Sequence, residues 1–255
     1  LTDITFQSVF PEKQIDRERQ VILDEIAMYE DSPEDALQDD FDEVVFGEHP
    51  LGKNILGTSD TLASFQRPDF LDFIQGNVAN GKIVLTIVGG LPFNRVLKIA
   101  TRHMQDIPLI QGNHQRLAPT PLFGQYIEKQ KPFGRAYCAM GRDAYSLDDQ
   151  QRYPFFMLTN ILGGPGMNSR LNMSLREKFG YVYSIDATFH SFTDSGMAGI
   201  FFGTEKRHLK KSLKLIHKEL RKLRDVRLGT LQLHSAKQQL KGQLAMSEEN
   251  NTSLM

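Results

Sequence analysis

Cysteine is nearly absent from this sequence, because Cys138 is the only one among 255 residues. A chain with one cysteine cannot form an internal disulfide framework or a cysteine zinc cluster. This scarcity fits a reducing compartment, and we expect a cytoplasmic protein. The sequence also lacks any run of about 18 apolar residues that could span a bilayer.

Net charge is small as well. Lysine and arginine total 30 and the acidic residues total 31, which gives a formal net charge of -1. Nothing global therefore favours nucleic acid or an anionic membrane as a partner. The chain starts at Leu1 without a signal-like segment, so we expect its start to be a cut, with any upstream targeting sequence out of view. The length allows one large or two modest domains.

Residues 11–31 carry an unusual pattern. Wound as a helix at about 100° per residue, they gather one apolar arc: Ile15, Val21, Ile22, Ile26, Met28 and Tyr29. Glu18 and Glu25 fall on the same arc, about two turns apart. A carboxylate turned toward a core is costly unless it is paired or bound to a metal. Two interpretations of these glutamates remain open. In the first, they lie at a solvated edge of the helix or form a salt bridge to Arg17 or Arg19; in the second, one is a metal ligand and the other a carboxylate that supports it.

Helical and strand-like patterns alternate along the rest of the chain. We expect helices at residues 32–49, 59–77 and 92–108, a buried strand at 82–90, and a polar linker at 109–122. Beyond the linker we expect one or two strands within 125–145, helices at 147–164 and 169–180, two strands around a turn at 193–196, and two closing helices. This order predicts an α+β protein of two similar mixed α/β sandwich domains, each an antiparallel-rich sheet with helices packed on it. The first, residues 1–108, would be truncated at its N-terminus, and the second would be residues 123–255.

Residues 205–224 are locally basic. An apolar stripe along the predicted helix would face the core and leave the lysines and arginines exposed to solvent. The stripe consists of Leu209, Leu213, Ile216, Leu220 and Leu223. No aromatic residues interleave with the charges. We therefore interpret this face as solvated rather than as a nucleic-acid site.

Three segments carry a family resemblance. They are RERQVILDEI at 17–26, FGEHPLGKNILG at 46–57 and SRLNMSLREKFGYVYS at 169–184. In this order and approximate spacing they resemble the pitrilysin or insulinase family of zinc peptidases, family M16, which includes the mitochondrial processing peptidases. The resemblance runs from about Phe10 to the C-terminus. It implies that two similar domains form a half-molecule and that two halves close around an unfolded peptide.

The resemblance assigns roles to the two carboxylates. It implies that Glu25 is the third protein ligand of a zinc ion and that Glu18 supports the site. The family's other ligands and its general base come from an inverted motif, His-x-x-Glu-His, which this sequence lacks. The family places that motif upstream, so it would lie before Leu1. We therefore expect zinc in the intact protein and not in this polypeptide alone.

A second pair lies in the third segment. By resemblance, Arg176 and Tyr183 reach the substrate carbonyl and stabilise the oxyanion, a donor role that guanidinium and phenol suit. The alternative for Tyr183 is a half-buried strand tyrosine, and Tyr181 is a rival for the same role. The alternative for Arg176 is a surface pair with Glu177 or Asp186.

The resemblance implies a fragment of a zinc metalloendopeptidase that hydrolyses peptides or unfolded polypeptides with a metal-activated water. The fragment itself would be inactive. The main alternative is a non-catalytic, peptide-binding subunit or half of the same family; a module that binds an acidic partner through the basic helix fits the three motifs poorly. The expected partners are a peptide substrate and a second peptidase half, in a homodimer, a heterodimer or the same chain. No nucleic acid or membrane partner is expected.

Overall fold

The computed structural model describes residues 1–78, 83–107, 117–120 and 124–254. The chain forms two compact units. Unit 1 comprises Leu1–Ile26, Leu56–Leu117 and Lys241–Met255, and unit 2 comprises Ala27–Ile55 and Ala118–Leu240. The predicted division into residues 1–108 and 123–255 stays a prediction, since most of the proposed linker lies outside the described residues.

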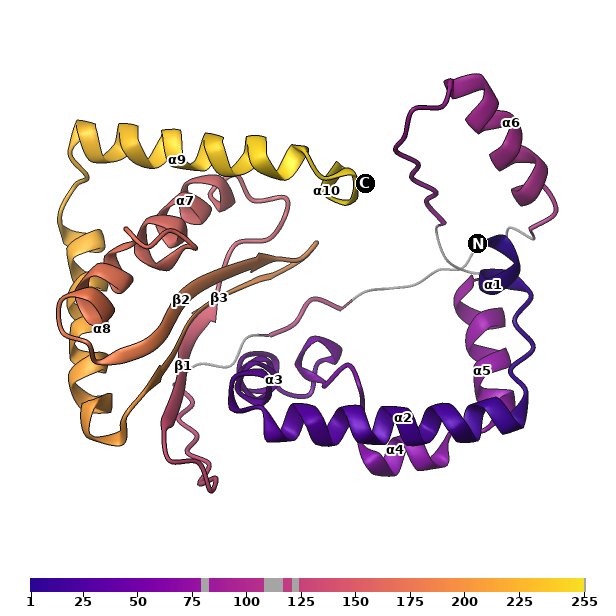
Figure 1. The fold of residues 1–255 in the computed structure, drawn as a ribbon, viewed down its shortest axis with the longest axis horizontal. Coiled ribbons are helices and arrows are strands. Elements are labelled where there is room, and N and C mark those ends of the chain that lie inside the picture. Colours follow the sequence, from indigo (N-terminus) through magenta and orange to yellow (C-terminus); the bar gives the residue numbers. More distant parts are fainter. Residues whose placement is uncertain (79–82, 108–116, 121–123, 255) are drawn as a thin grey trace. The chain divides into compact units, whose positions relative to one another are not determined.

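Unit 1 is helical in its described part (Figure 1). Its elements are α1 (Thr2–Phe6), the first part of α2 (Glu12–Asp31), α4 (Ser59–Ser64), α5 (Arg67–Phe73), η2 (Ile74–Val78), α6 (Phe93–Met104), the end of α9 (Thr230–Glu248) and α10 (Asn251–Leu254). The predicted helix at 59–77 is thus divided. The Gln66 backbone N–H donates to the Asp69 carboxylate at 2.7 Å and so caps the start of a new helix.

Little apolar surface is buried in unit 1. Leu62 is the one large apolar side chain that is buried among the described residues of this unit. No residue of α2 is buried, and Val21 remains 47% exposed. The prediction that the apolar arc of residues 11–31 faces a core is therefore wrong for this structure: Ile15, Ile22 and Ile26 are only partly buried, and the rest of the arc is exposed.

The strand predicted at residues 82–90 is also not seen. Residues 83–88 are described and belong to no strand. Both faces of the segment are open, since Val84 is 83% exposed and Ile87 is 50% exposed. A strand needs a neighbour for its backbone hydrogen bonds, and no described residue of unit 1 supplies one.

Unit 2 contains a three-stranded antiparallel sheet of order β1-β3-β2 (Figure 1). The strands are β1 (Ala136–Asp143), β2 (Val182–Ser191) and β3 (Gly196–Thr204). The helices of the unit are the end of α2, α3 (Pro33–Phe46), η1 (Pro50–Gly52), α7 (Arg152–Gly163), η3 (Asn172–Glu177), η4 (Lys206–His208), α8 (Leu209–Asp225) and most of α9. The α+β class is confirmed, as is the hairpin around residues 193–196.

One face of this sheet carries the larger core. Alternate side chains of β2 and β3 point to it and meet α7, η3 and α8. Its buried members are Leu162, Leu171, Leu175, Val182, Ile185, Ile200, Phe202 and Ile216. The predicted leucine stripe of α8 is confirmed, because Ile216 is fully buried while the basic residues between the stripe positions are exposed.

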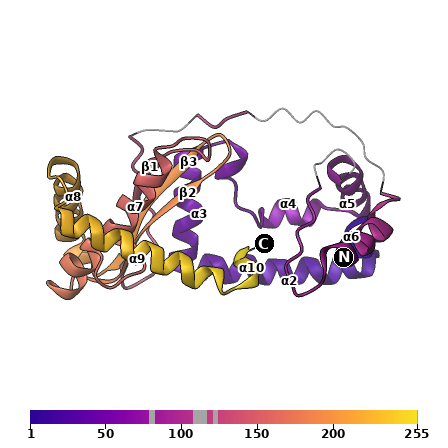
Figure 2. The same ribbon diagram turned by 90° about the horizontal axis from the view of Figure 1, so that it is seen from above.

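The other face packs against α3, which Figure 2 shows beside the strands. Its buried members are Phe41, Val45, Phe46 and Met197. Two glycines paired across β1 and β3, Gly141 and Gly199, leave a flat place for the Phe41 ring. A Cβ atom on Gly199 would lie 3.0 Å from that ring. The absence of side chains at this pair thus lets α3 approach the sheet closely.

Candidate functional site

Arg176 and Tyr183 lie at the two ends of a tight connection between η3 and β2. Gly180, in the left-handed region with φ of 60°, donates its N–H to the Arg176 carbonyl at 2.9 Å. The Tyr181 N–H then donates to the Leu175 carbonyl at 2.9 Å. These bonds close the end of the helical turn in a way that favours glycine. The connection fixes where β2 begins.

Tyr183 is the extra residue of a β-bulge. Val182 pairs with Thr204 and Ser184 pairs with Gly203, so no residue of β3 is left opposite Tyr183. A bulge changes the alternation of side chains and turns one of them away from its regular direction. Val182 and Ile185 are therefore both buried, whereas Tyr183 between them is 49% exposed.

Two charged groups contact the Tyr183 side chain, and a third pairs with one of them. Its hydroxyl donates to the Glu205 carboxylate at 3.2 Å, and the Arg135 guanidinium lies 4.3 Å from its ring centroid. Arg207 pairs with the same carboxylate at 2.5 Å. Desolvation would raise the pKa of Glu205, but the hydrogen bonds and charge of Arg207, together with the Tyr183 hydroxyl, lower it below the usual range. Glu205 is therefore ionised at neutral pH.

The rival tyrosine has a different environment. Tyr181 packs against the larger core and stacks on the His208 ring, with centroids 4.6 Å apart. Phe179 stacks with Tyr181 as well, at 5.3 Å. These contacts make Tyr181 part of the packing, whereas Tyr183 presents its phenol at the surface.

Arg176 is an exposed side chain at the end of η3. Its Nε lies 3.9 Å from the Glu177 carboxylate, with about half of each side chain exposed. Such a pair contributes little to stability. The structure records no pair between Arg176 and Asp186. The guanidinium is thus accessible to a ligand.

Glu18 and Glu25 belong to the unit 1 part of α2, and both are exposed. Neither has an ion pair within the part of the chain that the structure describes. Arg19 pairs instead with Asp16 at 2.6 Å and donates to the Phe65 carbonyl at 2.8 Å. The predicted burial of the two glutamates is therefore wrong here, and the predicted arginine pairs are not formed.

The described residues hold no cluster of three or more histidine, cysteine, aspartate or glutamate side chains that could bind a metal ion. Glu25 offers one carboxylate, which is a single ligand. A structural or catalytic zinc site needs three or four protein ligands. The residues present do not fit a complete zinc site.

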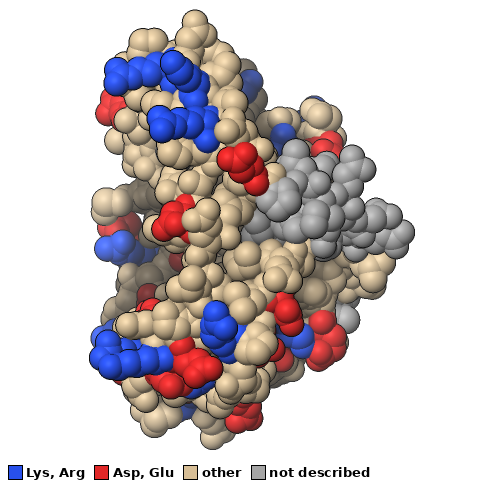
Figure 3. Space-filling model, turned by 90° about the vertical axis from the view of Figure 1, so that its right-hand side faces the viewer, with Lys and Arg blue, Asp and Glu red and all other residues tan. Residues whose placement is uncertain are grey.

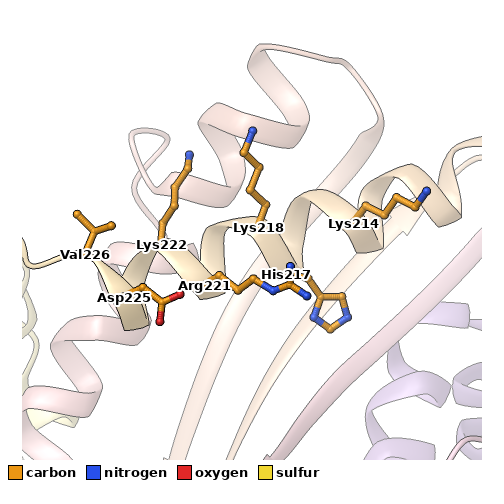
Figure 4. A pocket seen from close by; sticks show the side chains of 7 residues that line it. All are labelled: Lys214, His217, Lys218, Arg221, Lys222, Asp225 and Val226. Atoms are coloured by element: carbon orange, nitrogen blue, oxygen red, sulfur yellow. The ribbon is translucent and has the colours of Figure 1, made fainter.

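A solvent-open hollow runs along α8. It is lined by Lys214, His217, Lys218, Arg221, Lys222, Asp225 and Val226 (Figure 4). Lys218 and Lys222 project to one side of the helix, and His217 and Arg221 project to the other. None of the four predicted site residues lines this hollow. On the face of the molecule shown in Figure 3, side chains of both signs are scattered, with uncharged areas between them. The hollow remains a solvated basic surface.

Two neighbours of Tyr183 were not predicted from the sequence. Glu205 and Arg135 are distant from it in the chain, by 22 residues in the case of Glu205. A usable signal existed for Glu205, because a hairpin that turns at residues 193–196 brings residues near 204 opposite the start of β2. Arg135 just precedes β1 and had no comparable signal.

The fold defines the class of protein first. The solved structure of the peptidase M16 inactive domain from Pseudomonas fluorescens matches with a TM-score of 0.83 and 20% identity, over 94% of this chain and 58% of that one. A protease from Helicobacter pylori matches with a TM-score of 0.80 and 17% identity, over 96% and 61% of the two chains. A chain of Complex III2 from Candida albicans matches with a TM-score of 0.77 and 16% identity, over 93% and 58%. The fold is thus that of M16-type domains.

The chain belongs to the M16 peptidase family, because the family described as the peptidase M16 inactive domain matches residues 64–240. An uncharacterized zinc protease of Bacillus subtilis, YmxG, is 29% identical over 261 residues, which cover all of this chain and 62% of that protein. An uncharacterized zinc protease of Rickettsia felis is 31% identical over 249 residues, covering 98% of this chain and 60% of that protein. This chain therefore spans about three fifths of the length of these relatives. No helix in the described ranges is both long and apolar enough to cross a membrane.

Proposed function

We propose that this chain is part of a zinc metalloendopeptidase and that Arg176 and Tyr183 form its contact with the substrate carbonyl. The exposed phenol on the β-bulge carries the proposal. A strand tyrosine that served packing alone would resemble Tyr181, with its ring stacked on neighbours. The membership in the M16 family and the zinc proteases among the relatives support the same function.

Arg176 and Tyr183 suit a donor role. The guanidinium offers several N–H groups and the phenol offers one O–H, and neither group is buried. A peptide carbonyl gains negative charge on its oxygen when water attacks its carbon, so donors aimed at that oxygen stabilise the transition state. Both side chains would bind the oxygen of the scissile carbonyl.

Glu25 would supply one carboxylate to a zinc ion, and Glu18 would support that ligand. Their exposure, without partners among the described residues, leaves both side chains free to meet further ligands on the additional length that the relatives carry. Bound zinc would lower the pKa of a water molecule so that it could attack the peptide. The intact protein would then comprise two similar sandwich domains per half, with a second half as partner and a cytoplasmic location.

A non-catalytic, peptide-binding half of the same family is the second candidate. The match to the family's inactive domain supports it. Arg176 and Tyr183 would then hold a peptide without cleaving it. The two candidates differ in whether the longer protein binds zinc through Glu25.

The experiment compares this chain with a form of the protein as long as its relatives. Zinc content is measured by atomic absorption, and hydrolysis is measured with a fluorogenic peptide library. We expect zinc and hydrolysis in the longer form and neither in the 255-residue chain. Glu25→Gln in the longer form should lower zinc content and activity by roughly tenfold or more.

Asp24→Asn is the matched control, because Asp24 neighbours Glu25 on α2 and its carboxylate accepts a hydrogen bond from Gln20 at 3.1 Å. It should leave the zinc content unchanged. Unchanged zinc in Glu25→Gln would contradict the ligand role. If the longer form binds peptide but neither binds zinc nor cleaves, the second candidate is favoured. Robust cleavage by the 255-residue chain would show that the catalytic groups do not depend on residues outside it.

A further inference from the structure

We propose that Glu205 is a positioning residue for Tyr183: it holds the phenol proton in the substrate-free protein and yields it to the carbonyl oxygen of a bound peptide. This inference rests on the proposed function, since it concerns the same tyrosine. The Tyr183 hydroxyl would thus donate to Glu205 until a peptide binds, and then to the peptide carbonyl.

The bulge in β2 leaves the direction of the Tyr183 side chain open. Because Tyr183 has no partner residue on β3, its direction is not set by the regular pleat of the sheet. No described aromatic ring stacks on the ring of Tyr183, whereas His208 stacks on Tyr181. Something other than sheet geometry must therefore fix the phenol. Among the described residues, Arg135 lies over the ring and Glu205 accepts from the hydroxyl.

The hydroxyl proton of Tyr183 can serve one acceptor at a time. A phenol carries one O–H and can donate one hydrogen bond at a time, and an ionised carboxylate can only accept. While Tyr183 donates to Glu205 at 3.2 Å, it cannot donate to a peptide. Peptide binding at this tyrosine therefore requires that the bond to Glu205 is given up.

Arg135 and Glu205 both stay in place when the Tyr183 hydroxyl exchanges its hydrogen-bond partner. Arg207 pairs with the Glu205 carboxylate, so this carboxylate keeps a partner after the phenol turns away. The Arg135 guanidinium, 4.3 Å from the ring centroid, holds the ring by a cation–π interaction. The exchange then needs only a rotation of the O–H bond about the C–O axis.

The bond to Glu205 is exposed, so its loss should change peptide affinity modestly. A hydrogen bond to a charged group is weakened when solvent screens it. Removing the competing acceptor should lower KM by roughly two- to fivefold. The value of kcat should stay within about twofold, because free Tyr183 can serve the bound peptide and the transition state alike.

The first test is spectroscopic and uses the 255-residue chain. The seven tyrosines are labelled with carbon-13 at Cζ, and Tyr183→Phe assigns the signal of Tyr183. We expect Glu205→Ala to shift that signal and no other, and Glu205→Gln, which keeps an acceptor oxygen, to shift it less. Asp225→Ala is the matched control, because it removes another exposed carboxylate paired with an arginine, Arg224. It should shift none of the seven. A Tyr183 signal unchanged in Glu205→Ala would overturn the proposal.

The second test is a double-mutant cycle in the longer form of the protein, with KM and kcat measured for one peptide. Glu205→Ala should lower KM when Tyr183 is present and have no effect in the Tyr183→Phe background. An equal change in both backgrounds would show that Glu205 acts independently of the phenol. A rise in KM would show that Glu205 supports binding and does not compete with it. Either result overturns the proposal.

The failure of the proposed function looks different. If Tyr183→Phe leaves KM and kcat unchanged, Tyr183 has no role toward the peptide, and the proposed function fails at this residue together with the exchange. If Tyr183→Phe impairs the enzyme and Glu205→Ala changes nothing, the proposed function survives and only the positioning role fails.

Discussion

The rings of Phe41 and Phe201 lie edge to face, with centroids 5.1 Å apart and planes at 80°. Phe41 belongs to α3 and Phe201 to β3, so this contact joins a helix to a strand about 160 residues further along the chain. Edge-to-face aromatic pairs stabilise beyond the area that they bury. The contact fixes α3 on the face of the sheet opposite to α8.

Phe41→Ala should destabilise unit 2 by about 3 kcal/mol or more, because it removes a buried ring and leaves a cavity beside Gly141 and Gly199. Urea unfolding followed by circular dichroism measures the change. Phe156→Ala is the control, since that ring on α7 is 44% exposed, and it should cost less than about 1 kcal/mol. Equal losses in the two variants would contradict the packing of α3 against the sheet.

Gly199→Ala should destabilise the same contact from the other side. Its Cβ would lie 2.6 Å from the Phe201 ring and 3.0 Å from the Phe41 ring, so one ring must move, at a cost of about 1 to 3 kcal/mol. Gly203→Ala on the same strand is the control, because its nearest neighbour is the Tyr137 ring at 3.2 Å. That variant should be close to neutral. The Phe41→Leu change should relieve part of the Gly199→Ala loss if the two rings are the cause.

Asp42→Asn should stabilise the protein at neutral pH. Burial raises the pKa of Asp42, the nearby charge of Asp39 raises it further, and a hydrogen bond from Gln38 and the charge of His190 oppose the shift. The folded state therefore holds the Asp42 proton more tightly than the unfolded state does. The carboxyl group stabilises the fold below its unfolded pKa, and this contribution is lost as pH rises through its folded pKa.

The gain from Asp42→Asn at pH 7 should be below about 1 kcal/mol, because the carboxylate is only partly buried, and it should disappear near pH 3. Asparagine keeps the oxygen that accepts from Gln38 at 3.1 Å. Urea midpoints at pH 7 and pH 3 measure the difference. A gain that is the same at both pH values would show that the charge of Asp42 is not its cause.

Arg176→Ala in the longer form of the protein should lower turnover by roughly 10²-fold, the size typical for one lost oxyanion donor. Zinc content and thermal stability should hardly change, because the pair with Glu177 at 3.9 Å is weak and exposed. Lys178→Ala, two residues away, is the control and should retain activity. A fall in zinc content or in stability would show that Arg176 is structural.

Elements whose burial partners lie within this chain were predictable. The apolar sides of α3 and α8 follow the helical period, and Phe41, Val45 and Ile216 are buried as that period requires. The hairpin of β2 and β3 was also predictable, since β-branched and aromatic runs flank a turn. In these cases the sequence pattern and the packing agree.

The arc of α2 and the strand at 82–90 were not predictable in the same way. Periodicity shows which residues could face a core, but it does not show whether the chain itself supplies that core. Glu18, Glu25 and Val84 are exposed because no described residue of unit 1 covers them. The bulge at Tyr183 was hidden for another reason: it is a property of the register between two strands, which no single segment of sequence contains.

The segment at residues 83–88, which pairs with no strand in the part of the chain that the structure describes, affects how this polypeptide will behave when it is purified. Its sequence, IVLTIV, combines high β-propensity with no charge and no proline, the composition from which cross-β fibrils form. Where no described strand covers it, the segment of one copy can pair with that of another. We expect concentrated solutions to become turbid on storage and to bind thioflavin T, and a single lysine in place of Val84 to keep them clear.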